Sequence, residues 1–127
     1  MKWDEKKPKP GDPVRVKAEF YYHYGIWGDE KHVYAFGLPN NEGTPAEEIA
    51  VVCTPVEDFT SGGMLERGRL GFKELMNRKS ARNTVAYAED HVGETGYDLG
   101  KNNCRHFMCR CLYGEKLAER FGYGVEE

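Results

Sequence analysis

The first third of the chain alternates apolar and polar side chains, which is the pattern of half-buried β-strands. Alternation begins in residues 14–18, and the aromatic stretch 20–27 continues it. Turn-forming residues 27–31 lead into a further alternating segment, residues 32–36. These segments predict a β-meander in which the second and third strands form a hairpin.

Further extended segments are expected in the middle of the chain. Residues 37–45, rich in Gly, Pro and Asn, predict a loop, and the apolar run 49–53 predicts a buried strand. Residues 56–60 and 64–70 flank the turn-forming Ser61-Gly62-Gly63 and predict two extended segments around a tight turn.

The hydrophobic period changes in the last third of the chain. Apolar residues recur every three or four positions over residues 80–92, with Ser80 as a candidate N-cap and Gly93 just past the end, which predicts a helix. Asn102 and Asn103 are candidate caps for a second helix. Its apolar face is formed by Cys104, Phe107, Met108, Cys111 and Leu112.

Strands followed by helices predict an α+β domain, a small antiparallel sheet with helices packed on it. The 127 residues fit one domain, expected over residues 11–127, and the polar residues 1–10 are expected to be a flexible lead-in. A chain of this length buries roughly two-thirds of its unfolded surface on folding. Packing therefore suffices for stability, without metals or disulfides.

The net charge of −3 argues against a nucleic-acid partner, whose binding depends on positive charge. The longest apolar run, residues 49–53, is far shorter than the ~20 residues of a membrane-spanning helix, and the N-terminus lacks the apolar stretch of a signal peptide. We therefore expect a cytoplasmic protein with no integral membrane segment. Nothing in the pattern indicates its oligomeric state.

The four cysteines are expected to be free thiols, because a domain of this size without a secretory signal is typical of the reducing cytosol. Three of them fall within eight residues, yet no second short-spaced ligand pair of the kind that zinc sites use is present. We therefore predict neither a metal nor a cofactor.

Cys104 is the candidate nucleophile, because it begins a predicted helix, where backbone N–H groups and the helix dipole stabilise a thiolate. The alternative is that Cys104 is only the first apolar residue of the helix's inner face. For Cys109 and Cys111 packing is the only interpretation, with Cys111 on the apolar face and Cys109 turned away from it.

A thiol nucleophile needs a base, and the base needs a third group to orient it. His23 lies within the aromatic strand, while Tyr34 and His32 share one face of the next strand, from which either reaches across to it. The alternative is a structural His23. His106 is about 200° around the helix from Cys104 and should face away from the thiol.

The candidate histidine segment precedes the candidate cysteine segment in the chain, and this order resembles that of the lecithin:retinol acyltransferase-like family. Residues 23–29, leading into Val33-Tyr34, are similar to the family's His box. Residues 102–107 are similar to its Asn-Cys-Glu-His-Phe box, with Arg105 in place of the common Glu. Val56 to Phe59, followed by Gly62-Gly63, also resembles the family's middle segment, so the similarity covers nearly the whole chain.

The resemblance implies a permuted papain-like or NlpC-like fold with Cys104 as nucleophile and His23 as general base. It also implies a third polar residue, for which Tyr34 aligns with the family's position and His32 lies two residues earlier on the same face. The implied acyl donor is a phospholipid, and the same pair of groups also serves peptidases and amidases. A non-catalytic binding module on this fold remains the alternative from another class.

The expected chemistry is attack of the Cys104 thiol on an ester or amide carbonyl, followed by transfer of the acyl group from a thioester to water, an amine or an alcohol. Aromatic residues of the second strand are expected to divide between the core and an acyl groove. They are Phe20, Tyr21, Tyr22, Tyr24 and Trp27.

Overall fold

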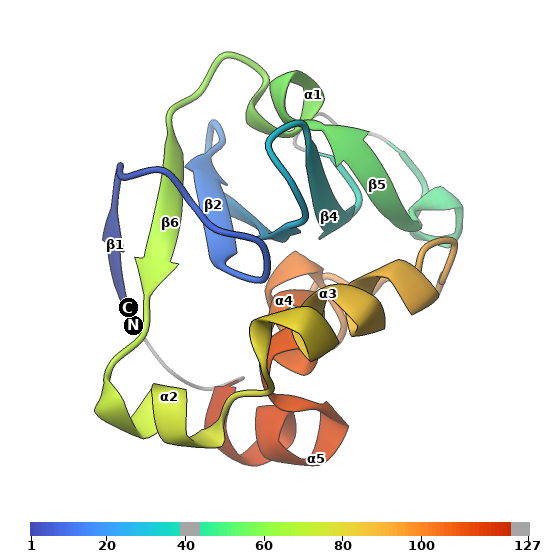
Figure 1. The fold of residues 1–127 in the computed structure, drawn as a ribbon. Coiled ribbons are helices and arrows are strands. Elements are labelled where there is room, and N and C mark those ends of the chain that lie inside the picture. Colours follow the sequence, from blue (N-terminus) through green and yellow to red (C-terminus); the bar gives the residue numbers. More distant parts are fainter. Residues whose placement is uncertain (39–43, 123–127) are drawn as a thin grey trace.

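A computed structural model describes residues 1–38 and 44–122, which form an antiparallel sheet with helices packed on it (Figure 1). The order of strands across the sheet is β1-β6-β2-β3-β4-β5. The predicted α+β class is confirmed. The strands are β1 (Lys2–Asp4), β2 (Pro13–Lys17), β3 (Tyr22–Trp27), β4 (His32–Phe36), β5 (Val51–Pro55) and β6 (Leu65–Arg69). The helices are α1 (Val56–Thr60), α2 (Phe72–Asn77), α3 (Ala81–Asp90), α4 (Cys104–Tyr113) and α5 (Glu115–Leu117), with a 3₁₀ turn η1 (Ala46–Glu48) and a π-helical segment η2 (Ala118–Gly122).

The predicted meander forms the centre of the sheet. Strand β3 pairs with β2 from Tyr22 to Ile26, with Val14 opposite Gly25. Its pairing with β4 begins only at Gly25, which lies opposite Ala35. Among the described strands, the first half of β3, residues 22–24, therefore has a neighbour on one side only, and α4 packs against β3.

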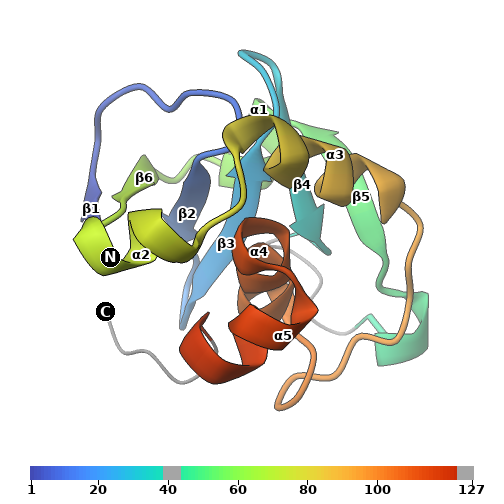
Figure 2. The ribbon, with the colours of Figure 1, turned by 60° about the horizontal axis from the view of Figure 1, so that its bottom comes forward.

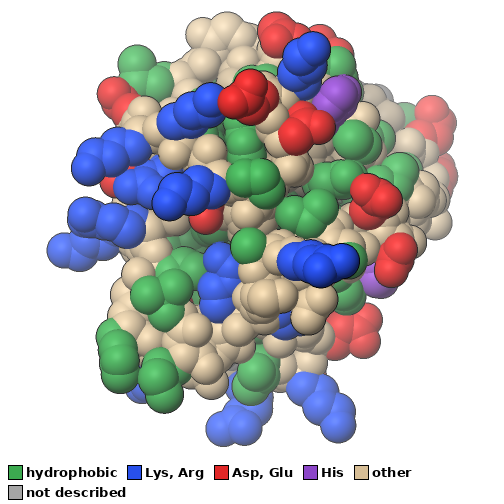
Figure 3. Space-filling view, in the orientation of Figure 1, with side chains coloured by type: hydrophobic (Ala, Val, Ile, Leu, Met, Phe, Trp, Pro, Cys, Tyr) green, Lys and Arg blue, Asp and Glu red, His purple; other side chains and the backbone are tan. Residues whose placement is uncertain are grey.

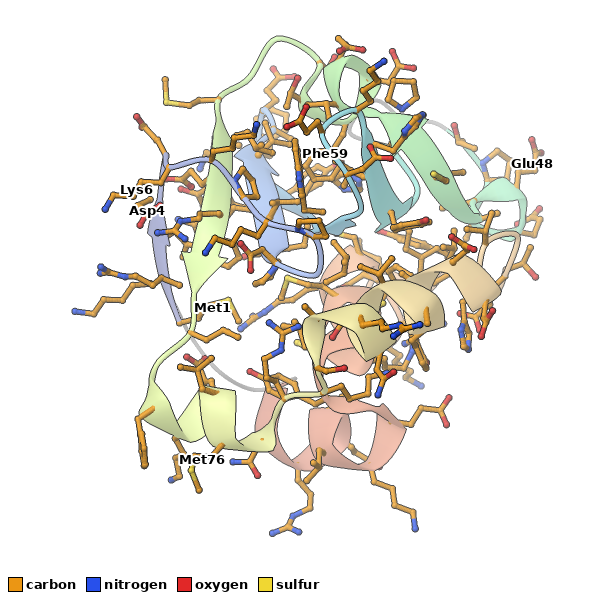
Figure 4. All side chains as sticks on the ribbon, viewed as in Figure 1. Met1, Asp4, Lys6, Glu48, Phe59 and Met76 are labelled. Carbon is orange, nitrogen blue, oxygen red and sulfur yellow. The ribbon has the colours of Figure 1, made fainter. Side chains whose placement is uncertain are left out.

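The sheet separates two hydrophobic clusters, because successive side chains of a strand point to opposite faces. The larger cluster, which includes Ile26, Phe36 and Phe107, lies between the sheet and the helices α3 and α4 (Figure 2). The smaller cluster includes Trp27 and Phe59 and lies between the sheet and α1, where Figure 4 labels Phe59. The candidate residues on β3 and β4 are thereby divided between two faces.

Both predicted long helices are present, and their caps explain where they begin. The Ser80 hydroxyl oxygen accepts a hydrogen bond of 3.1 Å from the backbone N–H of Asn83 at the start of α3. Gly93, just past the end of α3, has a φ of 95°, a left-handed conformation that glycine adopts without strain. The capping residues thus mark the boundaries of the helix.

The predicted extended segment over residues 56–60 is wrong, because these residues form α1. Pro55 precedes the helix, Glu57 and Asp58 occupy its first turn, and Ser61 ends it in the left-handed region with a φ of 46°. Acidic residues at a helix N-terminus are stabilised by the helix dipole. The following segment is a strand, β6, as expected, but it pairs with β2 and β1 rather than with residues 56–60.

The first ten residues, expected to be a flexible lead-in, include β1, which pairs with β6. The N-terminal amino group also forms an ion pair of 3.0 Å with Glu74 of α2, a helix that the hydrophobic pattern does not predict. Of the predicted loop 37–45, residues 39–43 lie outside the described residues. Every helix of the described chain is too short or too polar to cross a bilayer.

Candidate active site

Cys104 is the first residue of α4, and the cap that precedes it fixes its position. The Asn103 side-chain oxygen accepts hydrogen bonds from the backbone N–H groups of Arg105 (3.0 Å) and His106 (3.2 Å). The backbone N–H of Asn103 in turn donates to Nδ1 of His106 at 2.9 Å. This reciprocal capping box confirms the predicted cap and uses His106 for structure rather than for chemistry at the thiol.

The thiol of Cys104 is almost completely buried. Burial raises its pKa, and hydrogen bonds with the backbone of Tyr24, Arg105 and Cys104 itself act in the opposite direction. The net effect favours the neutral thiol, whereas the sequence led us to expect a thiolate stabilised by the helix N-terminus. Loss of hydration outweighs the backbone hydrogen bonds here. A base must therefore take the proton when Cys104 attacks a substrate.

Cys104 lines a cavity of about 790 Å³ to which several aromatic side chains contribute. This volume falls in the range of ~300–1,000 Å³ typical of ligand sites. Burial raises the pKa of Tyr97 to about 12, and the neighbouring Cys104 acts in the same direction. The aromatic residues of the wall are Phe20, Tyr21, Tyr22, Tyr24 and Tyr97. Four of the five expected groove residues thus line the cavity, and the fifth, Trp27, is in the core.

His23 is buried on β3, with its ring centroid 5.2 Å from that of Phe59. Its Nε2 lies 3.0 Å from the carbonyl oxygen of Gly37. Because a carbonyl only accepts hydrogen bonds, Nε2 carries the proton and Nδ1 of the neutral ring is the basic nitrogen. A backbone carbonyl, which no side-chain pattern reveals, therefore orients the imidazole.

Cys104 and His23 lie on opposite faces of β3, since the His23 ring packs on Phe59 of the smaller cluster and Cys104 belongs to the larger one. The thiol hydrogen-bonds to the backbone of Tyr24, the residue that follows His23. This point lies in the half of β3 that precedes its pairing with β4. The hydrogen bonds of the described residues include none between the thiol and the imidazole, so their pairing stays a prediction. Catalytic hydrogen bonds are often formed only when substrate is bound.

Tyr34 and His32 have other partners. The Tyr34 hydroxyl donates a hydrogen bond of 3.0 Å to Glu89 on α3, and burial followed by this hydrogen bond raises its pKa. His32 is the first residue of β4, with Nδ1 at 3.2 Å from Asp29 in the preceding turn. Neither contact involves His23, so an orienting role for either residue stays a prediction that the described contacts do not support.

The other two cysteines of α4 are both in the core. Cys111 is buried, as predicted. Cys109, expected to turn away from the apolar face, is also buried. The reason is that α5 and η2 pack against α4, so this helix is covered on more than one side.

The burial of His23 predicts a pH dependence of stability. Burial lowers its pKa from 6.5 to about 4, and the hydrogen bond to Gly37 opposes this effect. As the pH falls through 6.5, the unfolded state binds a proton at His23 while the folded state does not, so stability is lost down to about pH 4. Between pH 7 and pH 5 we expect this residue to cost about 2 kcal/mol of unfolding free energy, measured by urea denaturation.

The matched control is His23→Gln, whose amide N–H₂ still donates to the Gly37 carbonyl but does not titrate. The variant should lack this component of the pH dependence while keeping that of all other groups. Identical loss of stability in both proteins over this pH range would contradict a buried, neutral His23.

The fold and the site together define an α+β domain with a helix-terminal thiol in an aromatic cavity. The family model described as lecithin retinol acyltransferase matches residues 6–117, and the chain belongs to this family. The permutation implied by the resemblance stays a prediction.

Among curated relatives, the chain is 30% identical over 138 residues to the lecithin retinol acyltransferase of Mus musculus, covering 87% of this chain and 58% of the relative. The Rattus norvegicus protein is 29% identical with the same coverage. The Homo sapiens protein is 27% identical over 132 residues, covering 85% of this chain and 56% of the relative. The chain thus spans little more than half the length of these relatives.

Proposed function

We propose that this chain transfers acyl groups from a lipid ester through a thioester on Cys104. The observation that carries the proposal is the placement of the thiol at a capped helix start that opens into an aromatic cavity of about 790 Å³. Its curated relatives are named lecithin retinol acyltransferases, which supports a lipid donor. An apolar cavity favours an acyl chain, since a peptide backbone brings polar groups that need partners.

In the first half of the reaction, the Cys104 sulfur attacks the carbonyl carbon of the ester. The thiol proton passes to Nδ1 of His23, and the C–O bond to the leaving alcohol breaks as that alcohol takes the proton back. In the second half, an acceptor alcohol, an amine or water attacks the thioester and restores the thiol. The backbone N–H of Cys104 is the candidate donor for the oxyanion that forms in each half, since those of Arg105 and His106 donate to the Asn103 cap.

For this step the His23 ring must reach the thiol from its position beside Phe59. The thiol contacts the backbone of Tyr24, and the ring of the preceding His23 lies on the other face of β3 beside Phe59. The reaction therefore requires residues 22–24 to rearrange so that Nδ1 reaches the cavity side of β3, and their pairing with β2 opposes that movement. Gly37 holds the opposite ring nitrogen, as the third group of a catalytic triad does.

The role of His23 is tested by His23→Gln, assayed near pH 8, where His23 is neutral. We expect turnover of a monomeric short-chain phosphatidylcholine to fall by at least ~10²-fold, the usual contribution of a general base. Tyr34→Phe and His32→Ala test the predicted orienting role in the same assay. Because neither contacts His23 in the described structure, both should stay within about threefold of wild type, and a larger loss from either would support that role. Turnover of folded His23→Gln at the wild-type rate would show that another group is the base.

The same assay separates the candidate reactions. Release of fatty acid, or its transfer to an added amine or alcohol, supports acyl transfer from a lipid. Cleavage of short peptides or acyl amides in place of the phospholipid would instead identify a peptidase or amidase. Binding of phospholipid without any turnover would support a binding module on this fold.

A further inference from the structure

Two of the most exposed apolar side chains of the described residues stand at the cavity that contains Cys104. Phe20 is 78% exposed and Leu99 is 79% exposed, and both line this cavity. Tyr21, beside Phe20, is also exposed and lines the same space. Large apolar side chains that are held in water beside a ligand cavity mark an interaction surface.

The exposed residues come from two separate segments of the chain. Phe20 and Tyr21 belong to the connection between β2 and β3, and Leu99 to the loop before α4. This loop is held in place by Asn103, whose side-chain N–H₂ donates a hydrogen bond of 2.8 Å to the Leu99 carbonyl. The two segments meet at one cavity, so their apolar side chains form a rim around its mouth. We call Phe20, Tyr21 and Leu99 the cavity rim.

The charges of the described residues around the cavity show no excess of Lys and Arg, and the exposed Glu47 and Glu48 follow the cavity-lining Ala46. Glu19 and Arg105 both line the cavity, and the exposed Asp98 and Lys101 flank Leu99. A surface that bound anionic lipid would carry an excess of Lys and Arg, which each contribute attraction to such a membrane. The lack of a basic excess instead fits a lipid surface without net negative charge, as zwitterionic headgroups provide.

We propose that the cavity rim docks on a zwitterionic phospholipid bilayer, inserting Phe20 and Leu99 between the headgroups. The lipid ester then enters the cavity directly from the bilayer, without an acyl chain crossing water. This inference rests on the proposed function, since it names the surface from which the same site draws its acyl donor. The driving force is burial of apolar side chains, so the docking depends little on salt.

A second exposed apolar group provides a matched control. Phe72, Leu75 and Met76 of α2 are exposed, and none of them lines the cavity. Figure 3 shows apolar side chains gathered over α2, and in Figure 4 Met76 lies at the outer side of this helix. Lys73 and Arg69 lie beside this group in the sequence and are exposed. The α2 face therefore matches the rim in apolar character but has a basic surround.

The experiment measures partition of the full chain onto vesicles of pure phosphatidylcholine by sedimentation. Cys104→Ser is present in every protein, so that no lipid is consumed. We expect Phe20→Ser/Leu99→Ser to lower the partition coefficient at least tenfold, because both apolar side chains that insert are lost. Phe72→Ser/Leu75→Ser should bind as the parent does, and raising the salt to ~0.5 M should change binding little.

Exposed substitutions of this kind leave the fold intact, which urea denaturation of each protein verifies. The proposal is overturned if the parent does not bind phosphatidylcholine, if the rim variant binds equally well, or if only the α2 variant loses binding. Binding that requires phosphatidylserine and disappears in salt would also overturn it and point to the basic side of α2. The proposed function is tested separately by acylation of wild-type Cys104 with a monomeric donor, which needs no vesicle. Absence of acylation there would contradict the proposed function, whereas loss of vesicle binding would contradict only the docking.

Discussion

Cys104→Ala is expected to lower turnover by at least ~10³-fold while leaving the fold intact, because the acyl-enzyme route disappears with the nucleophile. Cys104 combines the capped start of α4 with a place in the wall of the aromatic cavity. The measurement is hydrolysis of a monomeric activated ester, with circular dichroism to verify folding. The residual rate of the variant then measures what substrate binding and oxyanion stabilisation contribute without the nucleophile.

Cys109→Ala and Cys111→Ala are the controls for this experiment. Both thiols are buried in the same helix, but neither lines the cavity. Each substitution should cost on the order of 1 kcal/mol of stability, through the small cavity it leaves, without abolishing turnover. Near wild-type turnover in folded Cys104→Ala would show that the cysteine mechanism is wrong and that another group carries the reaction.

The largest expected effect on stability is that of Phe107→Ala. Phe107 is fully buried one turn after Cys104, and its ring contacts that of Phe36 on β4 edge-on, with centroids 6.2 Å apart. Truncating a buried phenylalanine removes its transfer free energy and leaves a cavity, which together cost about 3–5 kcal/mol. Urea denaturation at neutral pH measures this loss.

The control for Phe107→Ala is Phe20→Ala, which removes an equal side chain that is mostly exposed. Its unfolding free energy should stay within about 0.5 kcal/mol of wild type. A loss below about 1 kcal/mol for Phe107→Ala would contradict the packing of α4 on the sheet that positions Cys104.

Local patterns are sufficient to predict the elements that carry the site. Alternation locates β2, β3 and β4, and the caps Ser80 and Asn103 locate α3 and α4. These signals are short-range, because a cap or an alternating run depends on residues that are neighbours in sequence. The run from Asn102 to Cys104 is therefore enough to place the candidate nucleophile at the start of its helix.

The features that local patterns do not predict depend on distant contacts or on the backbone. Helix α1 spans residues 56–60, too short to show a hydrophobic period, and Phe59 is its buried residue. Cys109 is buried because α5 and η2 return onto α4. The partner of His23 is the carbonyl of Gly37, and every residue carries such a carbonyl. Which of them faces an imidazole is decided only by the fold.

The central claim is that Cys104 carries the acyl group, and intact-protein mass spectrometry tests it most directly. The folded chain is incubated with a monomeric short-chain phosphatidylcholine, acyl amides and short peptides in separate reactions, then quenched in acid. We predict a mass increase of one acyl group with the phospholipid, lost on treatment with hydroxylamine because thioesters react with it, and absent in Cys104→Ala. An adduct that persists in Cys104→Ala, or turnover of the phospholipid with no adduct on wild type under rapid quench, would contradict the account.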